Sequence, residues 1–91
     1  MAIKFLAADP YFAPEALIRF RVSLDNKEIE CTISDDALKE LSGVYSNNPM
    51  PTFNANLGRI TQITEKLIEE NRFENEMIIV KSLDVQRFRN L

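Results

Sequence analysis

The most reactive side chain in this sequence belongs to a single cysteine. Cys31 is the sole thiol among the 91 residues, and the chain contains no histidine that would act as its base. A nucleophilic cysteine needs a neighbouring histidine, a cation or a helix N-terminus to lower its pKa. Asp35 and Asp36 open the helix expected just after Cys31, and their charge opposes a thiolate. We therefore expect Cys31 to be a buried, inert core thiol.

Glutamates provide the second candidate chemistry, either a cation site or a general acid–base pair. Five of them gather late in the chain: Glu65, Glu69, Glu70, Glu74 and Glu76. No Asp-x-Asp-x-Asn-Gly loop accompanies them to surround a calcium ion. Lys66 and Arg72 lie among them at spacings that permit ion pairs. We interpret the group as a solvated helix face and predict no metal, no cofactor and no catalytic residue.

Arginines provide a third candidate, an anion-binding patch. They lie in two groups, one on an expected hairpin and one in the tail: Arg19 and Arg21, Arg87 and Arg89. The patch forms only if the tail folds back beside the hairpin. The simpler expectation is that the hairpin arginines pair with Glu28 and Glu30. The chain has only two glycines, so it has no glycine-rich loop to hold a phosphate.

One segment combines an aromatic residue, a methionine and two prolines between two expected helices. Its candidate partner-contact residues are Tyr45, Pro49, Met50 and Pro51. Prolines pre-set backbone angles and so reduce the entropy lost when a loop binds a partner. Tyr45 and Met50 can instead close the core over the joint between the helices. The sequence leaves both interpretations open.

Composition restricts the class of protein that these residues belong to. A chain of 91 residues with 45% hydrophobic and 27% charged residues predicts one globular domain, residues 1–91. The net charge of −3 does not favour a nucleic-acid partner, which requires a basic face. No apolar stretch approaches a membrane helix, the start lacks a signal peptide, and one cysteine permits no internal disulfide. We expect a soluble cytoplasmic protein with a protein partner.

A β-hairpin is the clearest element that would position these side chains. Apolar residues alternate with polar ones over residues 18–24 and again over residues 29–33. Asp25 and Asn26 lie between the two runs and tolerate the positive φ angles of a type I′ turn. A two-residue turn there pairs Phe20 with Cys31 on one face and Arg21 with Glu30 on the other.

The other expected elements complete a two-layer α+β domain of order β-β-β-α-α-β, with a small, mainly antiparallel sheet and two helices on one face. Two further strands are expected, a short one at 3–6 that Asp9-Pro10 ends and one at 77–80. The helices are expected at 35–42, capped by Ser34 and stopped by Gly43, and at 53–71. Residues 11–15 are expected to be irregular, and the tail at 83–91 is unassigned. The expected inner positions are Phe5, Phe20, Val22, Ile29, Cys31, Leu38, Leu41, Phe53, Leu57, Ile60, Leu67 and Ile79.

The strand at 77–80 is apolar on both faces, although helices are expected on one face only. Its second face must therefore meet either Tyr11, Phe12 and Phe88 of the same chain or a second copy of the protein. The sequence is compatible with a monomer or a homodimer, and we favour coverage by the chain itself.

Several short segments resemble a known family of small bacterial proteins. They are residues 18–24 and 28–34, Ala37-Leu38, Gly43, Phe53-x-x-Asn56, and Ser82 with Asp84. Together they are similar to the domain of unknown function 1488. The resemblance implies an α+β fold and a bacterial cytoplasmic setting. It implies no established activity and no catalytic residue.

The sequence predicts a non-catalytic protein-interaction or regulatory module. Its contact surface would be the outer face of the sheet or the segment from Tyr45 to Pro51. The alternative is a small-ligand-binding protein or an enzyme that uses Cys31 or the surface carboxylates.

Overall fold

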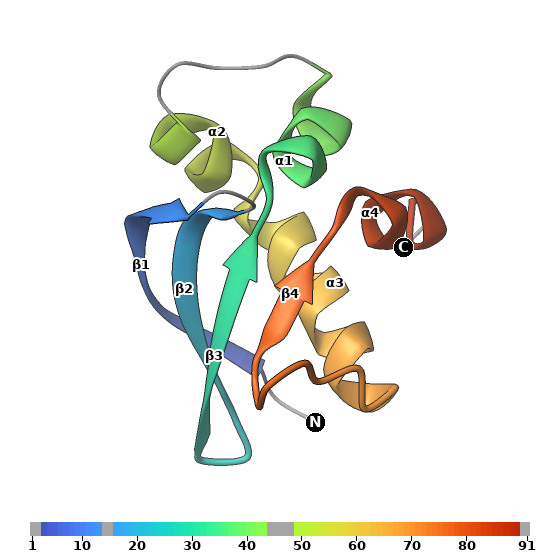
Figure 1. The fold of residues 1–91 in the computed structure, drawn as a ribbon. Helices are drawn as coiled ribbons and strands as arrows, with labels where there is room; N and C mark the ends of the chain where they lie inside the picture. Colours follow the sequence, from blue (N-terminus) through green and yellow to red (C-terminus); the bar gives the residue numbers. More distant parts are fainter. Residues whose placement is uncertain (1–2, 14–15, 44–48, 90–91) are drawn as a thin grey trace.

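The computed structural model describes residues 3–13, 16–43 and 49–89, with the backbone alone for residues 10–13, 16 and 17. The elements follow the order β1 (Ile3–Ala13), β2 (Ala16–Leu24), β3 (Lys27–Ile33), α1 (Asp35–Ser42), α2 (Pro49–Ala55), α3 (Leu57–Glu69), β4 (Ile78–Val80) and α4 (Ser82–Arg87) (Figure 1).

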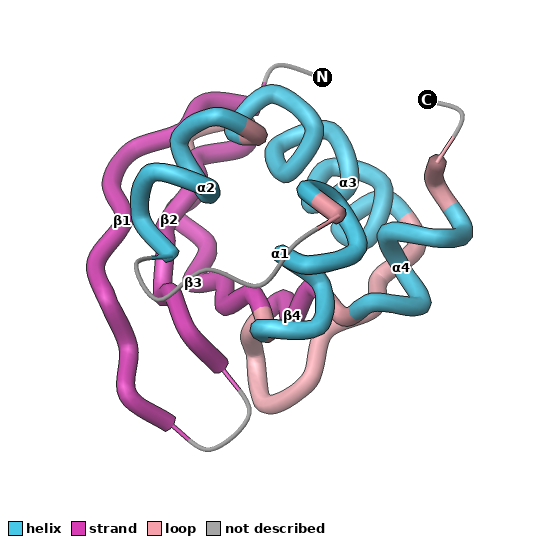
Figure 2. Tube along the Cα trace, turned by 90° about the horizontal axis from the view of Figure 1, so that it is seen from above, coloured by secondary structure: helices cyan, strands magenta, loops and turns pink. Residues whose placement is uncertain are grey.

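The four strands form one sheet in the order β1-β2-β3-β4. The pairs β1–β2 and β2–β3 are antiparallel, whereas β3 and β4 run parallel, so the sheet is mixed and mainly antiparallel. Figure 2 shows the strands as an arc with the helices on its concave side. This arrangement confirms the predicted two-layer α+β class. The opposite, convex side is called the outer face below.

The predicted hairpin is confirmed in both turn and register. Asp25 and Asn26 have φ angles of 53° and 67°, as a type I′ turn requires. Phe20 pairs with Cys31, and Arg21 pairs with Glu30. The inward side chains of both strands are buried. A shift of one residue would expose this whole apolar set, so burial of one face favours the observed register.

Strand β1 is longer than expected, and this prediction was wrong. Pairing with β2 continues past Asp9-Pro10 to Ala13, with irregularities between Phe5 and Ala7 and between Pro10 and Ala13. Proline is tolerated in β1 because this strand lies at the edge of the sheet and has one unpaired side. The irregularities absorb the residues that do not fit a regular ladder.

Helix α1 has the expected caps. Ser34 Oγ accepts a hydrogen bond of 3.1 Å from the backbone N–H of Ala37. Gly43 has a φ of 85°, and its N–H donates to the carbonyl of Lys39 at 2.6 Å. The helix therefore begins and ends where its capping residues predict.

The long helix expected at 53–71 is instead divided into α2 and α3. Helix α2 begins earlier, because prolines are compatible with a first helical turn. Asn56 interrupts the helical path with φ −112° and ψ 17°, and its Nδ2 donates to the carbonyl of Thr52 at 2.8 Å. Such a side-chain bond to the backbone competes with helix continuation. The unassigned tail forms α4.

The core lies between the sheet and the helices. Phe53 of α2 packs against Phe20 and Phe5, with ring centroids 5.4 and 6.1 Å apart. Thr64 is a polar residue among the buried residues of α3, and its hydroxyl donates to the carbonyl of Ile60 at 2.7 Å. Among the expected inner positions, the prediction that Ile79 faces the core is wrong. Its neighbours in β4, Ile78 and Val80, are buried instead, and Ile79 is half-buried on the outer face.

Candidate functional site

Cys31 lies in the core, in the middle of β3. Phe20 of β2 and Ile78 of β4 flank it, and its exposed fraction is 0%. The thiol donates to the carbonyl of Ile29 at 3.6 Å. Burial, together with the negative charge of Glu30, raises the pKa of Cys31 to about 12. A thiol that is protonated at neutral pH and inaccessible to solvent cannot attack a substrate.

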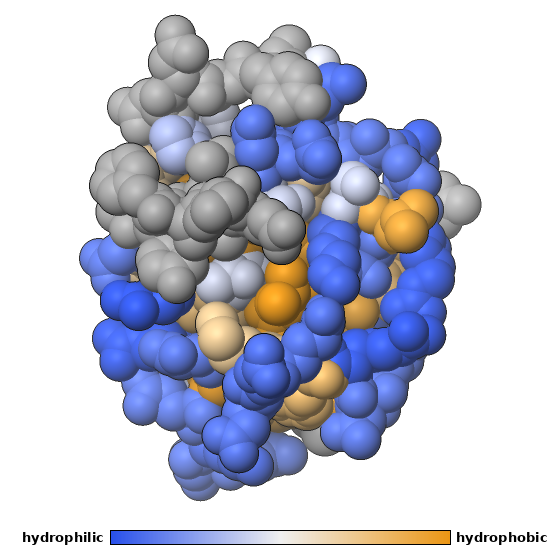
Figure 3. All heavy atoms as spheres, viewed as in Figure 1, coloured by the Kyte–Doolittle hydropathy of each residue, from blue (hydrophilic) through white to orange (hydrophobic). Residues whose placement is uncertain are grey.

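The outer face of the sheet carries charges of both signs. Its cations are Lys4, Arg19 and Arg21, and its anions are Asp9, Glu28 and Glu30, all exposed. Arg21 faces Glu30 in the register, as predicted, but its Nη1 forms an ion pair with Glu28 at 3.2 Å. The expected pairing of the hairpin arginines with these glutamates therefore holds for Arg21 and Glu28. Outside the atoms drawn in grey, Figure 3 shows a largely hydrophilic surface with a small hydrophobic area near its centre.

A shallow hollow of about 240 Å³ lies within the charged part of the outer face. It is lined by Ala7, Asp9, Arg19, Phe20, Arg21 and Glu30. The irregularity in β1 brings Ala7 opposite Arg21, so a small side chain stands among long charged ones. The hollow is therefore a consequence of one residue's size on an otherwise filled strand surface.

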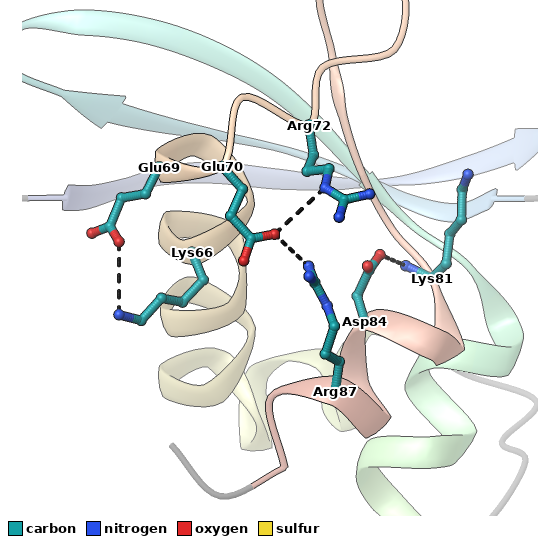
Figure 4. A network of polar contacts seen from close by, with 7 residues as sticks. All are labelled: Lys66, Glu69, Glu70, Arg72, Lys81, Asp84 and Arg87. Atoms are coloured by element: carbon teal, nitrogen blue, oxygen red, sulfur yellow. Dashed lines mark hydrogen bonds and ion pairs between the residues drawn. The ribbon is translucent and has the colours of Figure 1, made fainter.

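Three of the late glutamates, Glu69, Glu70 and Glu74, form surface ion pairs, and Figure 4 shows those of Glu69 and Glu70. Glu70 Oε1 contacts Arg87 at 2.6 Å and Arg72 at 3.5 Å. Lys66 pairs with Glu69 at 3.7 Å, which agrees with the interpretation of a solvated helix face. Within the described residues, no three histidine, cysteine, aspartate or glutamate side chains are placed to hold a metal ion.

The hairpin and tail arginines do not come together, so the condition for a shared anion-binding patch is not met, and ion pairing, the simpler expectation, describes Arg21, Arg87 and Arg89. Arg87 binds Glu70 at the end of α3, and Arg89 binds Glu40 of α1 at 2.6 Å. Helix α4 follows β4, whereas Arg19 and Arg21 belong to β2, on the other side of β3 (Figure 1). The tail therefore folds against the helices.

The proline-containing segment is only partly described. Tyr45 lies outside the described residues. Pro49, Met50 and Pro51 form the start of α2, and Met50 packs against the core. For Met50, this contact agrees with the interpretation that the segment closes the core. Pro51 is exposed, and its contact with a partner stays a prediction.

No role was predicted from the sequence for Arg59, a residue of α3. Arg59 is half-buried, and its Nη2 donates to the backbone carbonyls of Phe88 and Arg89 at 3.2 and 3.1 Å. A cation at this position stabilises the C-terminal end of α4. No periodic signal could have revealed it, because the tail was not recognised as a helix.

The described residues contain no helix long and apolar enough to span a bilayer. Taken together, these features define a small two-layer α+β domain with a buried thiol and a charged outer sheet face.

The family model described as "Protein of unknown function (DUF1488)" matches residues 3–80. The chain therefore belongs to this family, and the resemblance drawn from its sequence is confirmed. A crystal structure of a protein of unknown function from the same family, from Shewanella loihica PV-4, is similar with a TM-score of 0.75 and 26% identity, over 86% of this chain and 90% of that chain. No curated protein matches the chain.

Proposed function

We propose that this protein is a non-catalytic protein-interaction module of the bacterial cytoplasm, and that the outer face of the sheet is its contact surface. The described helices all lie on the opposite side, which leaves the charged residues of β1, β2 and β3 exposed to solvent. This open, charged sheet face is the observation that carries the proposal. The chain acts as a single domain.

The charge pattern favours a protein partner. Three cations and three anions lie on three neighbouring strands, so the described part of this face has no net charge to attract a polyanion such as nucleic acid. Mixed charges select a partner with the complementary arrangement and penalise other partners through like-charge contacts. The hollow beside Ala7 has room for one partner side chain between Asp9 and Arg21.

The core supports the non-catalytic part of the proposal. Cys31 is buried and its pKa is raised, so the described thiol does not supply a nucleophile. Of the late glutamates, Glu69, Glu70 and Glu74 are engaged in exposed ion pairs with lysine and arginine.

Reversal of one charge on the outer face tests the proposal. Arg21→Glu places a negative charge beside Glu28 and Glu30, and we expect it to abolish capture of a partner from a lysate of the source bacterium. Arg72→Glu is the matched control, since Arg72 is also an exposed arginine paired with one glutamate but lies outside the outer face. Captured proteins are compared by quantitative mass spectrometry.

The informative result is a protein captured by the wild type and by Arg72→Glu but not by Arg21→Glu. A partner retained equally by all three proteins would refute the outer face as the contact surface. If no protein is enriched by the wild type over an unrelated domain of similar charge, the interaction function itself is refuted. Circular dichroism establishes that each variant is folded.

A further inference from the structure

One long edge of the sheet is free in the single chain. Strand β1 stands first in the sheet order, so it pairs with β2 on one side only, and Figure 2 shows it as the outermost strand of the arc. It spans eleven residues, Ile3–Ala13, whereas β4 at the opposite edge spans three. The backbone N–H and C=O groups of an unpaired edge can form a ladder with a further strand. The length of β1 makes it the edge with the larger capacity for such pairing.

The first irregularity of β1 inserts one extra residue into the strand. Phe5 pairs with Val22 and Ala7 pairs with Arg21, so Leu6 has no residue of its own to pair with in β2. Leu6 and Ala7 together therefore occupy a single position of the ladder. Leu6 is 40% exposed, which is unusual for a large apolar side chain in this protein.

The extra residue makes β1 symmetric in the faces that its side chains occupy. In either direction from the position of Leu6 and Ala7, the next side chain packs against the core and the one after it is charged and exposed. The two core residues are Phe5 and Ala8, and the two charged residues are Lys4 and Asp9. In a regular strand, residues five positions apart point to opposite faces, so Lys4 and Asp9 share the outer face because of the irregularity.

The two charges of this strand are not matched within the chain. Lys4 and Asp9 are the charged residues of β1, and within the described part of the chain neither takes part in an ion pair. They have opposite signs and lie at equal distances from the centre of the irregularity. A strand with this arrangement is complementary to an antiparallel copy of itself.

We propose that two copies of the protein associate through β1, with the two strands antiparallel about a two-fold axis at the position of Leu6 and Ala7. Lys4 then faces Asp9 of the second copy, and Asp9 faces its Lys4. Leu6 lies against the small side chain of Ala7 of the second copy, so its exposed surface is covered. An isologous contact of this kind is the commonest way in which identical chains associate.

Only one register satisfies both faces of the paired strands. A shift by one position sets outer-face residues opposite core-side residues, and a shift by two separates Lys4 from Asp9 of the second copy. In the proposed register the extra residues of the two strands face each other, so they do not interrupt the new ladder. Pro10, which has no N–H to donate, falls opposite Ile3 at the end of this ladder.

The dimer joins the two sheets into one and places the two outer faces side by side. This inference goes beyond the proposed function and does not rest on it, because the ladder is formed by β1 alone. Arg21, whose reversal tests the outer face, belongs to β2. Arg21→Glu should therefore leave the association of the two copies unchanged.

Sedimentation equilibrium over a range of protein concentrations tests the proposal. The wild type should show a reversible equilibrium between monomer and dimer. Lys4→Glu and Asp9→Lys each turn two attractive cross-strand pairs into two repulsive ones, so either variant should weaken association by roughly tenfold or more. Lys27→Glu and Glu76→Lys make the same reversals at exposed positions outside β1 and should leave association unchanged.

A mixture of the two β1 variants tests the register itself. When Lys4→Glu pairs with Asp9→Lys, the new carboxylate faces the new ammonium, and the unchanged Asp9 faces the unchanged Lys4. Both pairs are then attractive, so the equimolar mixture should form dimers although each variant alone is weakened. Circular dichroism establishes that each variant is folded.

Three results would overturn the proposal. The first is a wild type that stays monomeric up to about 1 mM. The second is a dimer that Lys4→Glu and Asp9→Lys weaken no more than Lys27→Glu and Glu76→Lys do. The third is a mixture of the two folded β1 variants that associates no better than each alone. If a β1 variant fails to fold, amide hydrogen exchange of the wild type decides instead. Exchange in β1 should slow as the protein concentration rises, and exchange that is independent of concentration would refute the ladder.

Discussion

Replacement of Cys31 by alanine or serine tests whether Cys31 is a core thiol or a reactive one. The side chain is fully enclosed between Phe20 and Ile78, so removal of Sγ leaves a cavity of about one heavy atom. Such a truncation costs about 1–2 kcal/mol of unfolding free energy. In a domain of this size each kcal/mol lowers Tm by about 4–8 °C. Cys31→Ala should therefore melt at a visibly lower temperature than the wild type.

Serine should be worse than alanine at this position. The nearest acceptor, the carbonyl of Ile29, lies 3.6 Å from Sγ. A hydroxyl needs its acceptor at about 2.5–3.0 Å, and the C–O bond is shorter than the C–S bond, so Oγ would lie still farther away. The hydroxyl is then buried without a partner, which adds about 1–3 kcal/mol to the loss.

The pH dependence of these differences provides a second measurement. Burial and the negative charge of Glu30 raise the pKa of Cys31 from an ordinary value of 9.0 to about 12 in the folded protein. Between these values the folded state binds more protons than the unfolded state, so rising pH destabilises the wild type and not Cys31→Ala. One unit above the lower value, the wild type loses about 1.4 kcal/mol. The difference between the two proteins should therefore nearly vanish at about pH 10.

Urea denaturation of the three proteins at about pH 7 and about pH 10 tests both statements. Two results would refute the reasoning: a serine variant at least as stable as the alanine variant, or a difference between wild type and Cys31→Ala that is the same at both pH values. Rapid alkylation of the native thiol would also contradict it, since burial should protect Cys31 from the reagent.

Three further predictions concern local structure and association. Ser34→Ala should lower the unfolding free energy by about 1 kcal/mol, because the N–H of Ala37 loses its capping acceptor. Urea denaturation measures this loss, and an unchanged unfolding free energy would contradict the role of Ser34 as a cap. Glu76→Gly should raise the unfolding free energy by about 0.5–1 kcal/mol, because Glu76 has a φ of 65° in its turn. A loss of stability in the same assay would show that the Glu76 side chain makes a contact that outweighs the backbone strain. We expect Ile79→Lys to leave the mass measured by sedimentation equilibrium unchanged; a dimer that Ile79→Lys dissociates would instead show that a second copy covers the outer face at β4.

The hairpin could be predicted from the sequence because its pattern is local and redundant. Residues 18–24 and 29–33 alternate with period two, and the Asp25-Asn26 turn permits only one register that keeps both faces consistent. The caps of α1 were predictable for the same reason, since Ser34 and Gly43 act on backbone groups a few residues away. The burial of Cys31 then followed from its place in the alternation.

Other features depended on what lies next to a segment in space. Ile79 was predicted to face the core. A run of consecutive apolar residues does not show which of its two faces is covered. The parallel pairing of Ile79 with Thr32 of β3 places Ile78 and Val80 inward instead. Strand β1 extends beyond Pro10 because the edge position removes the need for a hydrogen bond on one side. Neither position is encoded in the residues of the segment itself.

The residues of the candidate sites likewise fall into two groups, those predictable from local sequence patterns and those that depend on tertiary contacts. The sequence by itself determined that Cys31 is a core residue and that the hairpin bears arginines and glutamates on one face, because period-two alternation assigns each side chain to a side. Only the tertiary structure decided that Arg87 and Arg89 bind Glu70 and Glu40 and that Arg59 meets the end of α4. Those contacts join residues 17 to 49 positions apart, and their energy comes from charges brought together by the packing of helices rather than from any local pattern.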